Sequence, residues 1–316
     1  MYYRFQFILA ISIVASCVGS TSGALLFYDS FDYDTSGGAS LSVAGAANWA
    51  KNQSSPDPTV QSGGGLTYPN LLVSSDTKSL QYDGSGINQG SGAPAATDGH
   101  TISGDGITTG SLYYSLLMKV PEVQSVIGAS SGNGFAAGGN LVTGSFMAGL
   151  QTVAANAATN APTSAAPLLI RSGDGTQFSS TYQLGTSKTA TAADRQFYTG
   201  QSFSTGANAE TVFVVLKYTF DSVNGDSANL FINPMPGAPE PAPQITHTGG
   251  TNLTLNMGIR SFFVRNNSVE PDVMLVDELR IGTTWADVTP AIPEPATGAI
   301  ALLGVCLSLL WRRRIM

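Results

Sequence analysis

Short runs of alternating apolar and polar residues, separated by turn residues, dominate the chain. In residues 211–220 every second side chain is apolar from Val212 to Phe220, and the other face adds Phe213 and Val215, so this strand should be central and mostly buried. Residues 111–120 alternate in the same way and end before Pro121. Further strands are expected at 25–31, 79–82, 146–150, 168–171, 228–233, 253–265 and 273–281. The pattern predicts an all-β domain over residues 25–290.

The intervening segments have the composition of turns and loops. Residues 221–226 carry Asp, Asn and Gly between two predicted strands, which predicts a β-hairpin. Residues 234–243 contain five prolines and should form a stiff surface loop. Gly-rich residues 84–110 and Ala/Asn/Thr-rich residues 153–167 are also expected to be loops, and Trp285 should pack in a closing segment.

The first 24 residues have the order of a secretory signal peptide. Arg4 precedes an apolar stretch, residues 5–18, and small residues follow up to Ala24, after which cleavage is expected. Two alternatives stay open. The segment could be an uncleaved anchor, or Cys17 could be the lipidated residue of a lipobox formed by residues 14–17.

The last residues predict a membrane segment. An apolar run from Ala296 to Trp311 ends in Arg312, Arg313 and Arg314. Arginines stay on the cytoplasmic side because moving them across a bilayer is costly, so the residues before this basic stop should lie outside. The run has 16 residues, fewer than the roughly 20 that span a bilayer comfortably, which suits a segment that holds the chain only until it is processed.

Charge and cysteine content restrict the partners. Four of the 14 basic residues and one of the 21 acidic residues lie in the two ends, which leaves ten basic and 20 acidic residues and a net charge near −10 between them. A nucleic-acid partner is disfavoured because phosphate binding needs a basic face. Both cysteines, Cys17 and Cys306, lie in the apolar ends, so the domain has neither a disulfide framework nor a thiolate nucleophile.

Pro293, Glu294 and Pro295 stand directly before the apolar run and the arginine cluster. This order resembles the PEP-CTERM sorting tail of bacterial proteins and assigns residues 291–316 to it. The resemblance implies recognition of the Pro-Glu-Pro motif by an exosortase, a membrane-embedded transpeptidase. The protein would be membrane-anchored through residues 296–311, then processed and delivered to the cell surface or the extracellular matrix.

A second resemblance lies in the domain itself. Residues 214–234, the Asp277-Glu278-Leu279-Arg280-Ile281-Gly282 run before Trp285, and the opening residues 27–32 resemble a concanavalin A-like, laminin-G-like jelly roll. Family membership implies a two-sheet sandwich with the first and last strands in one sheet. It says little about function, because one such fold hosts many functions.

The catalytic patterns that the fold's glycan hydrolases use are not apparent. The domain's glutamates are Glu122, Glu210, Glu240, Glu270 and Glu278, and none shares a strand with another at a spacing that would pair two carboxylates. Asp277 and Glu278 are adjacent, so on a regular strand they should point to opposite faces. His100 and His247 are expected in exposed loops, and two histidines make a poor metal site.

Calcium and glycans are the ligands worth considering. Asp221, Asn224, Asp226 and Asn229 are spaced densely enough to offer oxygen ligands, although a turn whose side chains bond their own backbone explains them as well. We therefore assign no metal site. Glycan binding would need exposed aromatic rings, and the candidates are Trp49, Tyr68, Tyr82 and Tyr182.

The sequence thus favours a secreted, non-enzymatic surface or matrix protein with a structural or adhesive role, with extracellular polysaccharide as a candidate partner and no cofactor. A ligand-free surface-layer component is a further option. The alternative is a glycan-active hydrolase of the same fold. A pair of carboxylates facing each other in a groove would favour that alternative.

Overall fold

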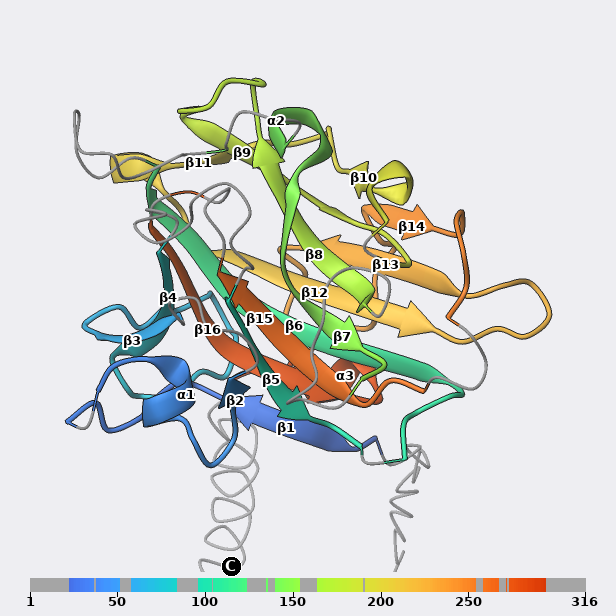
Figure 1. Ribbon diagram of the computed structural model, residues 1–316, viewed down its shortest axis with the longest axis horizontal. Helices are drawn as coiled ribbons and strands as arrows, with labels where there is room; N and C mark the ends of the chain where they lie inside the picture. Colours follow the sequence, from blue (N-terminus) through green and yellow to red (C-terminus); the bar gives the residue numbers. More distant parts are fainter. Residues whose placement is uncertain are drawn as a thin grey trace, which may run out of the picture.

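Two antiparallel β-sheets, which we name sheet A and sheet B, pack face to face (Figure 1). The structure is a computed structural model, and it describes residues 23–36, 38–51, 58–83, 96–103, 105–123, 135, 140–153, 164–189, 191–253, 258–266, 271 and 273–293. The all-β, two-sheet jelly-roll sandwich expected from the sequence is confirmed. Among the described residues no helix has the length and apolar character needed to cross a membrane, and residues 296–311 lie outside them.

Sheet A is ordered β14-β13-β12-β6-β16-β4-β3, and β1 also pairs with β16. The first and last strands therefore lie in one sheet, as the resemblance implied. The bounds are β1 (Leu25–Asp29), β3 (Thr59–Ser62), β4 (Lys78–Asp83), β6 (Ser111–Glu122), β12 (Val212–Thr219), β13 (Ser227–Ile232), β14 (Ile245–His247) and β16 (Val273–Gly282).

Sheet B is ordered β10-β9-β8-β7-β15-β5-β2, with β11 paired to β9. Its strands are β2 (Ala50–Lys51), β5 (Ala96–Thr101), β7 (Ser145–Gln151), β8 (Ser164–Ser172), β9 (Thr181–Thr186), β10 (Gln196–Phe197), β11 (Phe203–Ser204) and β15 (Ser261–Asn266). The helices are short: α1 (Leu41–Ala44), α2 (Asn140–Thr143), α3 (Trp285–Val288), η3 (Ala192–Asp194) and η4 (Gly206–Asn208).

The main core lies between the sheets and follows the predicted alternation. Leu112, Tyr114, Leu116, Met118 and Val120 all enter it from β6, and the even-numbered face of β12 meets them from the neighbouring strand. Each such side chain contributes about 1.5–3 kcal/mol when fully buried. The alternation therefore fixes which face of each strand turns inward.

The outer face of sheet A has its own apolar cover. Phe213 from β12 and Leu117 from β6 pack with Leu66, Leu71 and α3 in a second cluster. The ring centroids of Trp285 and Phe231 are 4.9 Å apart, and the Trp285 indole donates to the carbonyl of Ala238 at 2.9 Å. The closing role expected of Trp285 is confirmed, and so is the predicted hairpin, which joins β12 to β13.

Some strand boundaries differ from those the sequence predicted. β15 begins at Ser261 rather than at residue 253, and β6 continues through Pro121 to Glu122. β5 lies inside the predicted loop 84–110, and β8 begins at Ser164 within the predicted loop 153–167. These segments are rich in Gly, Ala, Ser and Thr, so their pairing is imposed by neighbouring strands rather than by an apolar pattern of their own.

A β-bulge interrupts β16 beside its partner β6, between Asp277 and Arg280. Glu278 has φ of 55°, a left-handed conformation that costs about 1–2 kcal/mol outside glycine. The carboxylate of Asp277 accepts from the Leu66 amide at 2.8 Å, and that of Glu278 accepts from the Ser74 amide at 2.6 Å. Both carboxylates therefore accept hydrogen bonds from the segment of residues 66–74, which packs on the outer face of sheet A. The expectation that they point to opposite faces is wrong, because a bulge breaks the regular alternation.

Stability should fall as the pH rises from about 4 to 8 because of Asp277. Burial, which outweighs the bonds from two backbone amides, raises the pKa of this carboxyl from 3.8 to about 8. A raised folded-state pKa contributes stability that is complete below the unfolded pKa and is lost as the pH passes the folded value. We expect urea unfolding to show this slope, and Asp277→Asn to flatten it. Asp221→Asn in an exposed turn is the control, and an unchanged slope in Asp277→Asn would contradict the assignment.

Candidate functional site

An aromatic cluster lies on the outer face of sheet B, apart from the main core. Phe146 from β7, Leu169 from β8 and Phe263 from β15 are buried there, and Phe197 from β10 packs against them half-buried. The rings of Phe146 and Phe263 meet edge to face with centroids 6.0 Å apart. Four strands thus contribute to one apolar surface on the side of the sheet that faces away from sheet A.

Glycines on the neighbouring strands make room for these rings. Gly185 pairs with Phe197 across β9 and β10, and Gly149 pairs with Phe263 across β7 and β15. A Cβ atom on Gly185 would lie 2.7 Å from the Phe197 ring, and one on Gly149 would lie 2.9 Å from the Phe263 ring. The two rings therefore lie over bare backbone.

Gly185→Ala should destabilise the protein by about 1–3 kcal/mol, because the new methyl group clashes with the Gln196 carbonyl oxygen and with the Phe197 ring. Urea unfolding measures this free energy. Gly249→Ala is the matched control, since its nearest neighbour would be 3.7 Å from the new atom. Equal stability of the two variants would show that the ring does not lie over Gly185.

Three arginines cover the aromatic cluster. The guanidinium carbon of Arg171 lies 4.4 Å from the centroid of Phe197, and that of Arg265 lies 4.2 Å from the centroid of Phe146. Arg195 approaches the Phe146 ring at 5.7 Å. Each side chain is partly exposed. We name this surface, formed by Arg171, Arg195, Arg265, Phe146, Phe197 and Phe263, the arginine–aromatic face.

Hydrogen bonds to neutral oxygens hold the arginines in place. Arg171 donates through Nε and one terminal nitrogen to the side-chain oxygen of Gln183, at 2.9 and 2.7 Å. Arg195 donates to the carbonyls of Thr143 and Gly144, just before β7. Arg265 donates to the Ser145 hydroxyl and the Phe146 carbonyl. These bonds orient the guanidinium groups over the rings.

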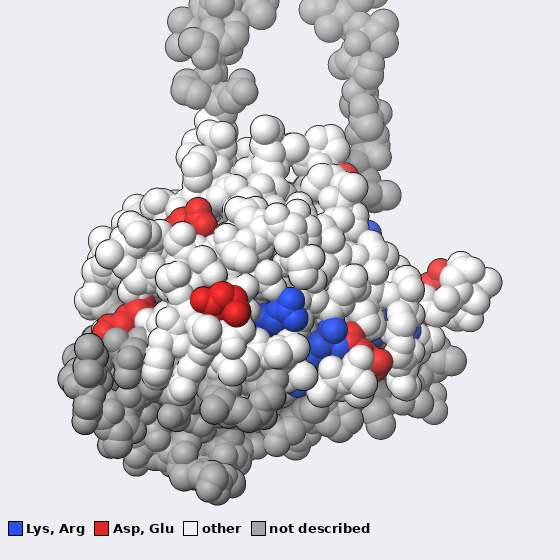
Figure 2. Space-filling view, turned by 90° about the horizontal axis from the view of Figure 1, so that it is seen from above, with Lys and Arg blue, Asp and Glu red and all other residues white. Residues whose placement is uncertain are grey.

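The electrostatics of this face favour an anion. Burial, followed by the positive charge of Arg265, lowers the pKa of Arg195, and burial lowers the pKa of Arg171. Crowded, partly desolvated cations gain stability when a negative group binds among them. The chain as a whole carries a net charge of −7, and on the side drawn in Figure 2 the described residues include only a few charged side chains. A cluster of three arginines is therefore a local departure from the chain's charge.

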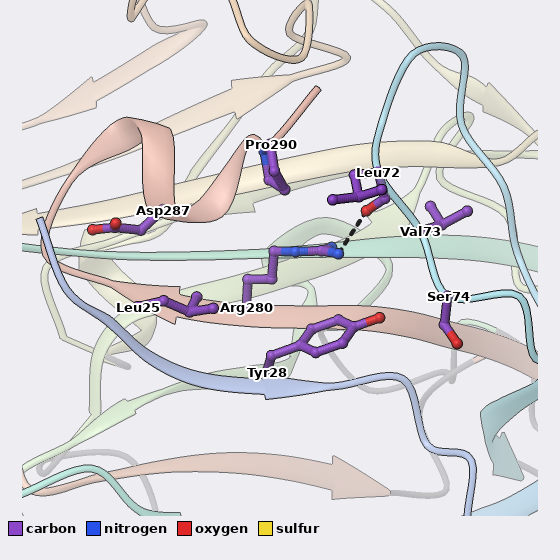
Figure 3. Close-up of a pocket in the computed structure, with 8 residues that line it drawn as sticks. All are labelled: Leu25, Tyr28, Leu72, Val73, Ser74, Arg280, Asp287 and Pro290. Carbon is purple, nitrogen blue, oxygen red and sulfur yellow. Dashed lines mark hydrogen bonds between the residues drawn. The ribbon is translucent and has the colours of Figure 1, made fainter. Parts of the chain in front are cut away.

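A second candidate is a pocket of about 470 Å³ on the side of sheet A (Figure 3). Leu25, Tyr28, Leu72 and Pro290 give it mostly apolar walls, and the guanidinium of Arg280 stacks over the Tyr28 ring at 4.5 Å. Arg280 forms an ion pair of 2.8 Å with the carboxylate of Glu278 and donates to the carbonyl of Leu72 at 2.6 Å.

The polar groups beside this pocket are engaged with one another. The Tyr28 hydroxyl donates to both carboxylate oxygens of Glu278 at 3.1 Å, and burial together with that carboxylate raises the pKa of Tyr28 to about 12. The side chains of Glu278 and Arg280 are 2 % and 5 % exposed, so the pair serves the structure of the bulge. The pocket offers a ligand chiefly apolar contact.

The candidates drawn from the sequence do not form a site. Trp49, Tyr82 and Tyr182 are buried in the core, so they are not exposed glycan-binding rings, and Tyr68 packs against Phe213 with its ring tilted by 44°. His247 lies in β14 rather than in a loop and is buried, and burial lowers its pKa. His100 falls within β5.

The turn itself uses the oxygen-bearing side chains that the sequence offered as candidate calcium ligands. Asp221 accepts from the amides of Val223 and Asn224 at 2.9 Å, and Asp226 accepts from the Tyr218 hydroxyl at 2.6 Å. Within the described part of the chain, no group of three or more His, Cys, Asp or Glu side chains could hold a metal ion.

The predictions for the two ends of the chain fall only partly on residues that the structure describes. Ala24 belongs to the edge of the fold, where its amide donates to the Thr283 hydroxyl at 3.0 Å. Pro293 is the last described residue, and Glu294, Pro295 and the arginines 312–314 lie outside the described residues.

Sequence reasoning missed the arginine–aromatic face. Its three arginines are among only ten basic residues between the two ends, and they stand in three different strands or their flanks. The signal that could have found two of them is a single arginine at the end of an apolar run, at Ile170-Arg171 and Val264-Arg265, since arginine is rarely fully buried. Their proximity, however, depends on strand order.

Comparisons with known proteins place the chain in no family. No protein-family model matches it, and no curated protein does. Solved structures that match include a carbohydrate esterase from a Shiga toxin-encoding bacteriophage, phi24B, with 10 % identity over 83 % of this chain and 99 % of that one at a TM-score of 0.41. An endo-β-1,4-glucuronan lyase from Trichoderma reesei matches with 12 % identity over 84 % and 99 % at 0.41. An alginate lyase from Pseudomonas aeruginosa matches with 10 % identity over 68 % and 86 % at 0.37.

These matches correct the expectation of a non-enzymatic structural or adhesive protein. The three matched proteins named above are carbohydrate-active enzymes, whereas the sequence had favoured a non-enzymatic protein over a glycan-active hydrolase. At such identities and TM-scores they assign no substrate and no catalytic residue to this chain.

Proposed function

We propose that this chain is a glycan-active protein that binds a carboxylated polysaccharide across the outer face of sheet B. The observation that carries the proposal is the arginine–aromatic face, where three guanidinium groups lie over two phenylalanine rings. Neighbouring strands are about 4.8 Å apart, so the five strands from β10 to β15 span roughly 19 Å. An extended chain of several sugar units fits across that width.

Acidic sugars suit this surface better than neutral ones. Arginine presents a planar fork of N–H donors that matches a carboxylate, and hydrogen bonds to charged groups are about twice as strong as neutral ones. Gln183 already orients the Arg171 side chain, so less side-chain conformational entropy is lost when Arg171 binds a ligand. The half-buried ring of Phe197 supports the Arg171 guanidinium from below.

The same face suggests the class of reaction. In a polymer of uronic acid units, a base can remove the C5 proton beside the carboxylate, after which the C4–O bond breaks, a C4=C5 double bond forms and the leaving oxygen takes a proton. Charge develops on the carboxylate as the proton leaves, and arginines bound to it stabilise that charge. We therefore propose elimination on a uronate polymer as the reaction that this face would assist.

A panel of polysaccharides tests the proposal. The full chain should be retained on immobilised alginate and polyglucuronate and pass through neutral β-glucans, and retention should fall as salt is raised because the contacts are ionic. Incubation with the retained polymer should produce ultraviolet absorbance from unsaturated ends. Equal retention on neutral polymers, or retention that salt does not weaken, would contradict a carboxylate-binding face.

We also propose that the protein is exported and anchored by its tail before processing. The sequence supports this through the signal peptide ending at Ala24, and through the Pro293-Glu294-Pro295 motif ahead of residues 296–311 and the basic stop. An exosortase-type transpeptidase would then release it to the cell surface or matrix. Mass spectrometry of the native protein tests this. A chain ending near Pro293 supports processing, and a retained Arg312-Arg313-Arg314 peptide contradicts it.

A further inference from the structure

Exposed apolar side chains gather around the pocket on sheet A. Leu25, Tyr28 and Leu72 line that pocket and are 50 %, 39 % and 43 % exposed, and Ile292 is 54 % exposed. Among the described residues these four are a large share of the big apolar side chains left in contact with solvent. A group of exposed large apolar side chains often marks a surface that contacts a protein, a ligand or a membrane.

Backbone hydrogen bonds hold these residues side by side. The Leu72 amide donates to the carbonyl of Pro290 at 2.9 Å, and the Ile292 amide donates to the carbonyl of Asn70 at 2.9 Å. Leu25 pairs with Gly282 at the start of β1. We name the surface formed by Leu25, Tyr28, Leu72 and Ile292 the apolar patch. Leu25 and Tyr28 belong to β1, Leu72 lies between β3 and β4, and Ile292 is next to the last described residue.

The charged groups beside the patch are already satisfied. Arg280 is 4 % exposed and is bound to Glu278 and to the Leu72 carbonyl. The carboxylate of Asp287 accepts from both the amide and the hydroxyl of Thr284, at 2.8 and 2.7 Å. Covering the patch would therefore leave both Arg280 and Asp287 with their hydrogen-bond partners.

The position of the predicted membrane segment indicates that a lipid bilayer covers the patch. Ile292 stands four residues before Ala296, where the apolar run of residues 296–311 begins. Four residues span at most about 14 Å when fully extended. A bilayer that holds residues 296–311 would thus lie within that distance of the patch, and the polar headgroup layer alone is about 5–7 Å thick on each side.

We propose that the apolar patch docks on the surface of the lipid bilayer that holds the C-terminal segment, and so fixes the orientation of the domain. This inference rests on the proposed membrane anchor and is independent of glycan binding. The patch lies on sheet A, whereas the arginine–aromatic face lies on the outer side of sheet B. Docking therefore turns the proposed glycan-binding face away from the membrane and leaves it open.

An environment-sensitive probe tests the docking. Cys17 and Cys306 are replaced by serine in the full chain, and Leu72→Cys is labelled with the fluorophore NBD. The matched control is Val223→Cys, an exposed apolar position at the tip of the β12–β13 hairpin. Both are compared in detergent and in vesicles of phosphatidylethanolamine and phosphatidylglycerol.

In vesicles the Leu72 probe should emit at shorter wavelength and be quenched several-fold more by nitroxide-labelled lipid than the Val223 probe. Equal behaviour of the two probes would overturn the proposal, and so would failure of the full chain to float with the vesicles. A shift of the Leu72 probe that depends on protein concentration in detergent would also overturn it, because the patch would then contact a second copy. Retention on alginate is measured on the same preparation, so failure of docking is distinguishable from failure of glycan binding.

Discussion

Arg171→Gln will weaken binding of an oligouronate by about 10- to 100-fold, because it removes a charge-assisted hydrogen bond worth about 1.5–3 kcal/mol. The side chain stacks on Phe197 and is oriented by Gln183, so its position barely changes when a ligand arrives. Isothermal titration at fixed salt measures the effect. Arg171→Lys keeps the charge but loses the planar fork, and it should recover only part of the affinity.

Lys217→Gln is the matched control for that experiment. Lys217 also lies over an aromatic ring, with its nitrogen 5.1 Å from the centroid of Tyr113, but it stands on sheet A and is paired with Glu240. Its loss removes the same charge from the molecule while leaving the arginine–aromatic face intact. If Lys217→Gln weakens binding as much as Arg171→Gln, the ligand responds to total charge, and the assignment of the face is wrong.

Glu278→Ala will lower the free energy of unfolding by about 3–5 kcal/mol. It leaves the charge of Arg280 buried without its carboxylate, which is the costly way to break a buried ion pair. In this variant alanine takes the φ of 55°, and the left-handed conformation costs alanine about as much free energy as it costs glutamate. Glu278→Gly should recover roughly 1 kcal/mol, since glycine adopts this conformation freely.

Glu240→Ala supplies the comparison for the buried pair. Glu240 and Lys217 form an ion pair of 2.9 Å, but their side chains are 31 % and 21 % exposed, and such surface pairs contribute about 0–1 kcal/mol. Urea unfolding of both variants gives the two free energies under the same conditions. A loss in Glu278→Ala no larger than that in Glu240→Ala would show that the bulge does not depend on the Glu278–Arg280 pair.

The sequence could predict the sandwich because its central strands carry their own pattern. Residues Val212 to Phe220 alternate with a period of two, and the structure buries their two faces in the two clusters that this alternation implies. β5 could not be predicted in the same way, since Gly99 and its polar neighbours look like a loop. Its pairing with β15 is a long-range contact that no local pattern records.

The arginine–aromatic face was hidden for a related reason. Arg171, Arg195 and Arg265 are separated by up to 94 positions in the sequence, and only the strand order β10-β9-β8-β7-β15 brings them to one surface. The error at Glu278 was different. A regular strand places Asp277 and Glu278 on opposite faces, and a bulge in a run of ordinary strand residues has no reliable sequence signal.

Equilibrium binding of one oligouronate and of its carboxyl-reduced form tests the central claim most directly. Reduction turns each carboxylate into a neutral alcohol and leaves the sugar rings and linkages unchanged. If the arginine–aromatic face recognises carboxylates, the reduced oligomer will bind at least about tenfold more weakly than the acidic one, and the difference will disappear in Arg171→Gln. Equal affinity of the two oligomers for the unmodified protein would contradict the account.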